Sequence, residues 1–322
     1  MMNKGIALAG SIIHDRIFRI NSYPKEGTLT QINGIDNAVG GLVPNDAIDL
    51  KKLSPSLPVY ALGRVGDDES GRFVLGRMNN LGINTESVRI SPAAATGFTE
   101  VMSVYGGQRT FFTHAGANDE FSFDDIPWDS LQVDMLHLGY FLLLAAVDGG
   151  DGLKILKEAK KRGIKTSIDL VSEDSDRYGL VRPVLPYVDN LIVNEHEAGA
   201  LTGIAPTEDN LPLIADELLK AGVSERVIIH SPDMGLVKTV SSLTTLPSYQ
   251  LPVGFIKGTA GAGDAFCSGA LLGIYEGRSD LEILEYATLA AISSLRAEDG
   301  SSAVEELSLL KREFAALERK KI

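Results

Sequence analysis

A lone carboxylate follows a glycine-rich stretch late in the chain. Residues 258–266 read GTAGAGDAF, where small residues lead to Asp264 and then to an apolar run. Small residues let a backbone approach a ligand closely, and free N–H groups at a helix start bind anions. A carboxylate there would repel a resting phosphate, so Asp264 suits the task of accepting a proton from an incoming hydroxyl. The stretch indicates phosphoryl-transfer chemistry; the alternative is an ordinary glycine-rich turn with an acid in the first helical turn.

Two common nucleotide-binding motifs do not occur in the sequence. There is no G-x-x-x-x-G-K-[ST], and the glycines form no G-x-G-x-x-G after the N-terminal strand. These two observations count against a P-loop enzyme and against an NAD-dependent reductase.

Composition limits the class of protein and the kind of partner. The chain has 322 residues, 44% of them apolar, and a formal net charge of −13. That charge disfavours broad contact with nucleic acid or anionic lipid, so a small-molecule partner is expected. A single cysteine, Cys267, excludes an intramolecular disulfide and a cysteine-rich zinc site, and it fits the cytoplasm. The apolar part of the N-terminal MMNKGIALAG is too short for a signal peptide or a membrane span and is typical of a first β-strand.

Apolar patterning predicts how the chain positions this stretch. Strand-like and helix-like runs alternate from residue 59 to residue 229, which is typical of a parallel α/β sheet. An antiparallel pair is expected between residues 235 and 250, and long helices after Gly261 and Ser279. Ser279 begins a capping box, and the apolar residues that follow it at helical spacing, starting with Leu281, predict a core helix.

Two segments break the α/β rhythm and predict a small β-lid. They lie at about residues 12–40 and 96–115, and Gly106-Gly107 in the second is typical of a hairpin turn. No internal repeat or low-complexity linker occurs, so residues 1–322 are expected to form a single domain with this excursion.

Six motifs, in order along the chain, resemble those of the ribokinase-like carbohydrate kinases, also called the phosphofructokinase-B family. The similarity extends over about residues 5–300. The motifs are GSIIHD at 10–15, VGGLVPNDA at 39–47, LGRVGDDESG at 62–71, HAGAN at 114–118, NEHEAGALTG at 194–203 and GAGDAF at 261–266.

The resemblance implies a fold, a reaction and a set of site residues. The implied fold is a three-layer α/β/α, Rossmann-like body with a β-sheet lid over a sugar pocket, and the implied enzyme is a carbohydrate kinase that uses ATP with Mg²⁺. Asp264 matches the general base, and the backbone of Gly261, Ala262 and Gly263 matches the anion hole. The other implied positions are Asp15, Gly40, Gly41, Asn45 and, as the weakest candidate, Arg109 for the sugar; Asn194, Ser231 and Gly235 for the nucleotide; and Glu197 with Asn194 for the metal.

The sequence also departs from the family pattern. Gly258, Thr259 and Ala260 replace the D-T-T that contributes to a monovalent-cation site, so little effect of potassium is expected. In residues 230–235, HSPDMG, Pro232 removes a backbone donor from a loop that usually contacts ATP phosphates, so ATP affinity is expected to be modest.

Three matters stay open from the sequence. The acceptor is a small sugar or sugar derivative, or else a nucleoside bound on an apolar platform. A protein that keeps the kinase fold but acts as a low-activity sugar or nucleotide sensor is a further alternative, which the retained GAG and Asp264 disfavour. The resemblance also raises a homodimer formed through the lid.

Overall fold

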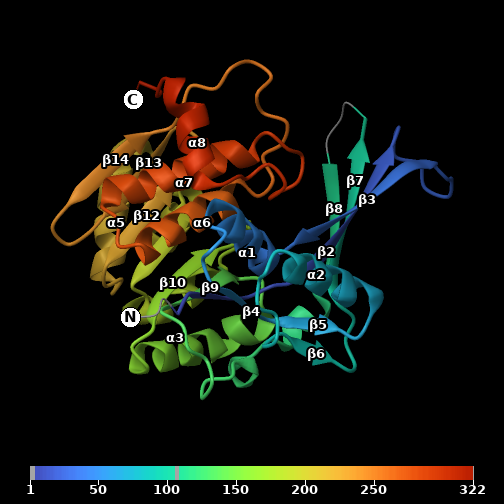
Figure 1. Ribbon diagram of the computed structural model, residues 1–322, viewed down its shortest axis with the longest axis horizontal. Helices are drawn as coiled ribbons and strands as arrows, with labels where there is room; N and C mark the ends of the chain where they lie inside the picture. The colour runs from blue at the N-terminus through green and yellow to red at the C-terminus, as the bar shows by residue number, and fades with distance from the viewer. Residues whose placement is uncertain (1–3, 106–108, 322) are drawn as a thin grey trace.

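A sheet of eight strands forms the centre of the molecule (Figure 1). The computed structural model describes residues 4–105 and 109–321. In spatial order the strands are β14 (Leu243–Pro247), β13 (Met234–Lys238), β12 (Arg226–His230), β11 (Asn190–Asn194), β10 (Lys165–Leu170), β9 (Met135–Phe141), β1 (Ile6–Ala9) and β4 (Val59–Leu62). The six strands from β12 to β4 run parallel, and β13 and β14 add an antiparallel pair at one edge. The predicted α/β class is confirmed.

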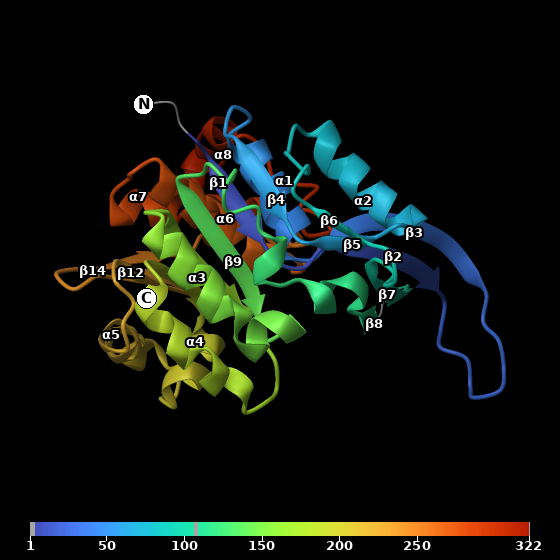
Figure 2. The same cartoon turned by 90° about the horizontal axis from the view of Figure 1, so that it is seen from below.

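Helices cover both faces of this sheet (Figure 2). They are α1 (Leu42–Leu53), α2 (Glu69–Asn80), α3 (Gly152–Lys161), α4 (Glu195–Thr202), α5 (Leu211–Lys220), α6 (Ala262–Tyr275), α7 (Asp280–Ser294) and α8 (Leu307–Glu313). Alternation along β1 divides the core, because successive side chains of a strand face opposite ways. Ile6 and Leu8 pack in the core that contains residues of α1, α6 and α7. Ala7 and Ala9 pack in the core that contains residues of α3, α4 and α5. The body therefore has three layers.

The helix α7 begins as the sequence predicts but buries a different face. Ser279 caps it, with its side chain accepting from the Glu282 N–H while the Glu282 carboxylate accepts from the Ser279 N–H. Leu281, predicted to be core, is 51% exposed, whereas its neighbours Ile283 and Leu284 are completely buried. The prediction for Leu281 is wrong because α7 packs on both α6 and the sheet, so its buried surface is wider than one stripe and starts later.

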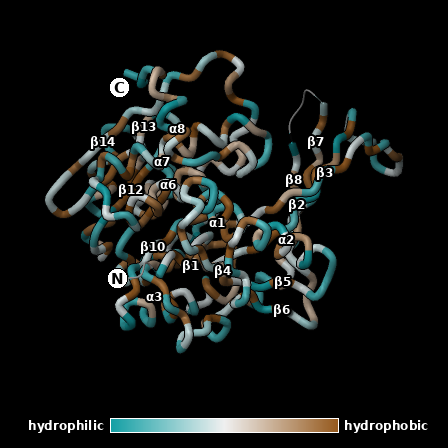
Figure 3. The backbone as a smooth tube through the Cα atoms, in the orientation of Figure 1, coloured by the Kyte–Doolittle hydropathy of each residue, from teal (hydrophilic) through white to brown (hydrophobic). Residues whose placement is uncertain are grey.

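A second sheet projects from the body, to the right in Figure 1. Its strands, in order, are β3 (Ile32–Gly40), β2 (Ile13–Ile20), β7 (Gly97–Val104) and β8 (Arg109–His114). The strands β2 and β7 are parallel, and the outer pairs are antiparallel. In Figure 3 apolar segments gather around β12 and α6, whereas this second sheet alternates between apolar and polar residues. The predicted turn at Gly106-Gly107 lies outside the described residues.

Two further features complete the description. A two-stranded parallel sheet joins β5 (Arg64–Gly66) to β6 (Arg89–Ser91). Within residues 4–105 and 109–321, every helix is too short or too polar to cross a membrane.

Candidate active site

Asp264 lies in the first turn of α6, three residues after a backbone position that requires glycine. Gly261 caps the helix with φ at 73°, in the left-handed region that favours glycine. A Cβ atom there would also come within 2.3 Å of the Gly300 Cα atom. The Ala262 N–H already donates to the Thr259 carbonyl oxygen at 3.3 Å. Because the Ala262 N–H is already engaged, the Gly261 and Gly263 N–H groups are the two predicted anion-hole donors better placed to meet a ligand.

Both carboxylate oxygens of Asp264 accept hydrogen bonds from other elements. Asn45 of α1 donates from Nδ2 to Oδ2 at 2.8 Å, and the Tyr140 hydroxyl at the end of β9 donates to Oδ1 at 2.8 Å. Burial raises the pKa of Asp264 to about 6, the nearby charge of Asp169 adds to that rise, and the two hydrogen bonds oppose it. Asp264 is therefore mostly ionised at neutral pH, although it is only 7% exposed.

Tyr140 is a site residue that sequence reasoning missed. Its backbone has φ at 57°, uncommon for a residue with a side chain, and its N–H donates to Asp169 Oδ1 at 2.6 Å. Burial raises the pKa of the Tyr140 phenol well above its usual value, so the group stays protonated and donates. The only available signal was a polar residue at the carboxyl end of a central parallel strand, where ligands of α/β proteins bind.

The residues predicted to contact the sugar meet where β2, β3 and α1 converge. Asp15 faces Gly40 so closely that a Cβ atom on Gly40 would lie 2.3 Å from Asp15 Oδ2. Burial raises the pKa of Asp15 to about 6, and the charge of Asp264 contributes to that rise. Gly41, with φ at 80°, starts α1 and leads to Asn45 one turn later. The structure thus brings Asp15, Gly40, Gly41 and Asn45 together near Asp264.

Asn194 and Glu197 form a capping box at the start of α4. The Asn194 side chain accepts from the Glu197 N–H at 2.9 Å, and the Glu197 carboxylate accepts from the Asn194 N–H at 3.0 Å. Ser172 joins them, because its hydroxyl donates to Glu197 Oε1 at 2.6 Å and accepts from Asn194 Nδ2 at 2.8 Å. Burial raises the pKa of Glu197 to about 7. Both residues line a cavity of about 210 Å³ that Asp264, Asp169 and Gly263 also line.

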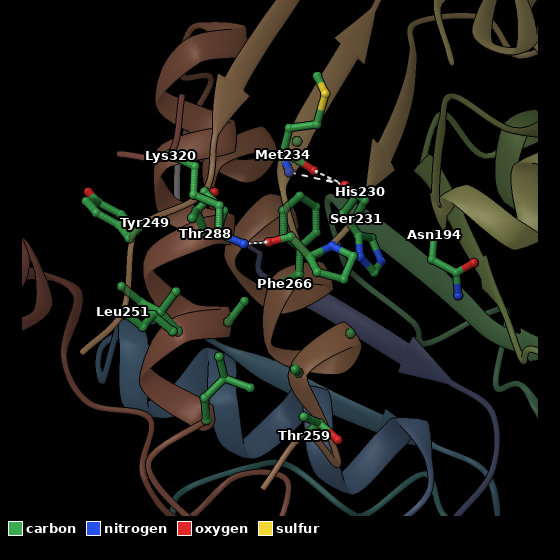
Figure 4. Close-up of a pocket in the computed structure, with 18 of the residues that line it drawn as sticks. Asn194, His230, Ser231, Met234, Tyr249, Leu251, Thr259, Phe266, Thr288 and Lys320 are labelled. Carbon is green, nitrogen blue, oxygen red and sulfur yellow. Dashed lines mark hydrogen bonds between the residues drawn. The ribbon is translucent and has the colours of Figure 1, made fainter. Parts of the chain in front are cut away.

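A larger cavity, of about 670 Å³, lies beside the smaller one, where β11 and β12 end (Figure 4). Its wall is mostly apolar and includes Phe266, on which the His230 ring packs with 4.5 Å between ring centroids. The predicted nucleotide residues Ser231 and Gly235 line it, as do Asn194 and Gly263. The other lining residues include Met234, Leu251, Ile256, Thr288, Ala291, Ile292 and Leu295. The cavity therefore meets the smaller one at Gly263, one residue before Asp264.

The loop that contains Pro232 is closed by its own hydrogen bonds and by the C-terminal segment. Ser231 Oγ accepts from the Met234 N–H at 3.1 Å, and Lys320 donates from Nζ to the Pro232 carbonyl oxygen at 3.0 Å (Figure 4). Lys320 also pairs with Asp233 at 2.7 Å. Lys320 is a second residue that sequence reasoning missed, because nothing local to residues 318–321 indicates that they return to this loop.

Arg109 makes a contact of another kind. Its guanidinium donates to the Glu298 carbonyl oxygen at 2.8 Å and to the Glu298 carboxylate at 3.2 Å. Arg19 of β2 lies 3.5 Å from the same carboxylate. Arg109 thus joins the second sheet to the segment that follows α7, and its predicted role in sugar binding stays a prediction.

The chain is similar to known proteins over most of its length. The family model described as pfkB family carbohydrate kinase matches residues 3–306. The ribokinase of Arabidopsis thaliana is similar, with 26% identity over 290 residues that cover 89% of this chain and 74% of that protein.

Two solved structures have the same fold. The structure of A. thaliana ribokinase complexed with ribose and ATP has a TM-score of 0.81 and 22% identity, with 97% of this chain and 98% of that chain covered. A nucleoside kinase from Methanocaldococcus jannaschii, an archaeal member of the ribokinase family, has a TM-score of 0.79 and 18% identity, with 97% and 98% covered. At such identities these two structures support the fold alone.

Proposed function

The chain belongs to the pfkB family of carbohydrate kinases, and we propose that it transfers the γ-phosphoryl group of ATP to a hydroxyl of a small sugar or sugar derivative. The observation that carries this proposal is the position of Asp264. Its buried carboxylate lies at the start of α6, beside Gly261 and Gly263 and between the residues grouped around Asp15 and the cavities that extend to His230.

Asp264 acts as the general base in the proposed reaction. Its carboxylate takes the proton of the sugar hydroxyl while that oxygen bonds to the γ-phosphorus, and the bond from the γ-phosphorus to the leaving ADP oxygen breaks. The Gly261 and Gly263 N–H groups, with that of Ala262 as the third predicted donor, stabilise the charge on the transferring group. Tyr140 and Asn45 hold the carboxylate in place through their hydrogen bonds.

The larger cavity would hold the nucleotide. Its apolar wall suits a purine ring, and Asn194, Ser231 and Gly235 line it on the way to the smaller cavity. Because Pro232 has no N–H and the Ser231 side chain is used within its own loop, few donors are left there for phosphate oxygens. We therefore keep the expectation of modest ATP affinity.

Glu197 and Asn194 would hold Mg²⁺ through its bound waters. The donor set fits, because the smaller cavity is lined by oxygen ligands, and Mg²⁺ usually keeps several waters. The hydrogen bonds that already engage Glu197 favour contact through water over direct coordination. When bound, the ion supplies positive charge that offsets the charge developing on the phosphates.

The register of the second sheet supports a sugar as acceptor. Asp15 is paired with Ala38 and Thr99, and Thr99 with Thr113, so these four residues form one row across the sheet. Residues of one row face the same side, and this row is small and, apart from Ala38, polar. Such a row suits sugar hydroxyls, which need hydrogen-bond partners and space.

A nucleoside is the second candidate acceptor, favoured by the next row on the same face. Two residues along each strand, Asp36 is paired with Ile17, Ile17 with Val101 and Val101 with Phe111. Apart from Asp36 on the outer strand this row is apolar, and an apolar surface with an aromatic ring is the kind of platform that a base requires. In a nucleoside kinase, Phe111→Ala would weaken acceptor binding, whereas in a kinase of small sugars it would have little effect.

The second sheet would act as a lid within a single domain of residues 1–322. Arg109 and Arg19 contact Glu298 and so join the second sheet to the body. This contact lies near Gly300, which packs against Gly261 at the start of α6. Ile35 and Phe112 are exposed on the face of this sheet opposite to Asp15, which favours a homodimer formed through the lid. Light scattering on wild type and on Phe112→Ser tests the dimer. A monomeric wild type would contradict the dimer.

The proposed use of ATP and the reduced Cys267 fit the cytoplasm.

A screen of ATP consumption tests the proposed function. The purified protein is incubated with MgATP and, in turn, with hexoses, pentoses, sugar acids, phosphosugars and nucleosides, and ADP is measured. We expect acceptor-dependent ADP release with one class and a product heavier by one phosphoryl group. Binding of a sugar without ADP release would favour the sensor, and absence of both would contradict the proposal.

A further inference from the structure

A buried group of metal-ligating side chains lies next to Asp264. Asp46 of α1, His137 of β9 and Cys267 of α6 each offer one ligand atom, and these atoms all lie within 4.8 Å of one another. Asp169 of β10 lies beside this group, with its Oδ2 3.7 Å from His137 Nε2, but it is not one of the three residues whose ligand atoms are all mutually close. Three of these side chains have no part in the proposed phosphoryl transfer.

The separation between Cys267 and His137 matches that between two ligands of a tetrahedral ion. With zinc bonds of about 2.3 Å to sulfur and about 2.0 Å to nitrogen or oxygen, tetrahedral angles place S and N about 3.5 Å apart and N and O about 3.3 Å apart. In this structure Cys267 Sγ is 3.6 Å from His137 Nε2. The Oδ2 atoms of Asp169 and Asp46 are 3.7 Å and 4.0 Å from the same nitrogen. The Cys267–His137 separation already fits, Asp46 would have to move by about 0.7 Å toward His137, and the Asp169 carboxylate would have to turn further to join the group.

Asp46 indicates that this group lacks a partner. Its side chain is completely buried, and neither oxygen finds a hydrogen-bond partner in the described ranges 4–105 and 109–321. Burying an unpaired carboxyl group costs free energy, and native proteins rarely leave such a group unsatisfied. A cation held between Asp46 and its neighbours would satisfy it.

His137 is oriented as a metal ligand usually is. Its Nδ1 lies 2.9 Å from Ser167 Oγ. When Nδ1 carries the proton and donates it to that hydroxyl, the Nε2 lone pair faces Cys267, Asp169 and Asp46. Ligating histidines commonly donate their other ring N–H in this way, which fixes the ring.

We propose that Asp46, His137 and Cys267 form a binding site for one zinc ion, and that Asp169 completes it by turning its carboxylate toward them. A thiolate, an imidazole and carboxylates are donors that Zn²⁺ accepts together, whereas a thiolate disfavours Mg²⁺. The site also has an entry path, because Cys267 and Asp169 line the cavity of about 210 Å³. This site is distinct from the proposed Mg²⁺ site at Glu197 and Asn194.

Zinc here would join the elements that position the general base. The four ligands come from α1, β9, β10 and α6, so one ion would cross-link them. The other oxygen of Asp169 accepts from the Tyr140 N–H, and Tyr140 donates to Asp264. The ion would therefore stabilise the folded protein and would hold Tyr140 in place through Asp169.

Cobalt substitution tests the site in the intact protein. Co²⁺ is added to chelator-treated wild type in the presence of excess Mg²⁺, and the absorption spectrum is recorded. We expect one Co²⁺ per chain, the visible bands of a tetrahedral ion and a thiolate-to-cobalt charge-transfer band in the near ultraviolet. Because the chain has only one cysteine, that band reports Cys267 alone. Zn²⁺ should abolish both sets of bands.

Two variants sharpen the test. Cys267→Ser should remove the charge-transfer band and weaken Co²⁺ binding at least tenfold. Asp49→Asn is the matched control, since Asp49 is also completely buried on α1 without a partner among the described residues but lies outside the ligand group. It should keep the wild-type spectrum. Zn²⁺ should also raise the melting temperature of the wild type but not that of Cys267→Ser.

Results with the wild type alone can overturn the proposal. A folded wild type that binds no Co²⁺ would exclude this site. Co²⁺ binding without the charge-transfer band would show that other side chains hold the ion, and would also exclude it. If the charge-transfer band persists in excess Mg²⁺ and added Zn²⁺ does not abolish it, zinc would be excluded as the resident ion. Each measurement is independent of kinase activity.

Discussion

The Tyr140 hydroxyl donates to Asp264 across 2.8 Å, while the Tyr140 N–H donates to Asp169 across 2.6 Å. One residue at the end of β9 thus ties the carboxylate of α6 to the carboxylate at the end of β10. The left-handed backbone of Tyr140 makes both bonds available at once. The orientation of the proposed base therefore depends on a residue outside the glycine-rich stretch.

Replacing Tyr140 with phenylalanine should move the acidic limb of the pH profile. Asp264 accepts a proton only when ionised, so kcat/KM should fall below a pH near the pKa of Asp264, about 6. The Tyr140 hydrogen bond lowers that pKa, so its loss raises the pKa and moves the limb to higher pH, by about one unit for a bond to a charged group. Tyr178→Phe, at a buried tyrosine whose hydroxyl bonds to the Glu173 backbone, is the control. An unchanged profile in Tyr140→Phe would count against this role.

Neutralising Glu197 should alter the Mg²⁺ requirement of the reaction. At pH 8, above the pKa of Glu197 of about 7, Glu197→Gln keeps the size of the side chain and removes its charge, so the Mg²⁺ concentration for half-maximal rate should rise on the order of tenfold. The KM for the sugar should change much less. Glu195→Gln tests the neighbouring acid, which the capping box does not use. If Glu195→Gln gave the larger effect, the assignment of Glu197 would be wrong.

Lys320 should affect nucleotide binding without affecting chemistry. Lys320→Met removes the two bonds that hold the loop at Pro232 and Asp233, so the KM for ATP should rise by about threefold to tenfold at an unchanged kcat. The control is Lys321→Met, because Lys321 takes no part in either bond. Equal effects of both variants would indicate a general charge effect near the cavity instead.

Potassium should have little effect on turnover. The position before Gly261 where the family has an acidic D-T-T is Gly258-Thr259-Ala260, which offers no carboxylate to a monovalent cation. Rates are compared in potassium and tetramethylammonium salts at equal ionic strength. Strong stimulation by potassium would show that other groups, such as backbone carbonyls, build the cation site.

The sequence predicted the parts of the fold and site that depend on local chemistry. The helix start at Ser279 could be predicted because a capping box consists of four consecutive residues. The role of Asp264 could be predicted because a carboxylate after GAG is unusual. Contacts that depend on the packing of distant segments were not predicted. Tyr140 lies near the end of an apolar strand, where only its polar side chain marks it. Lys320 lies 87 residues beyond its partner Asp233 in the sequence. Asp46 was passed over because its complete burial follows only from how α1 packs on α6.

The most direct test of the account is the activity of Asp264→Asn. This substitution keeps the shape of the side chain and removes its capacity to accept a proton, so kcat should fall on the order of 10²- to 10⁴-fold, while calorimetry shows little change in sugar affinity. Steady-state kinetics with an acceptor found in the screen provides the measurement. A kcat close to that of the wild type would contradict the assignment of Asp264 as the general base.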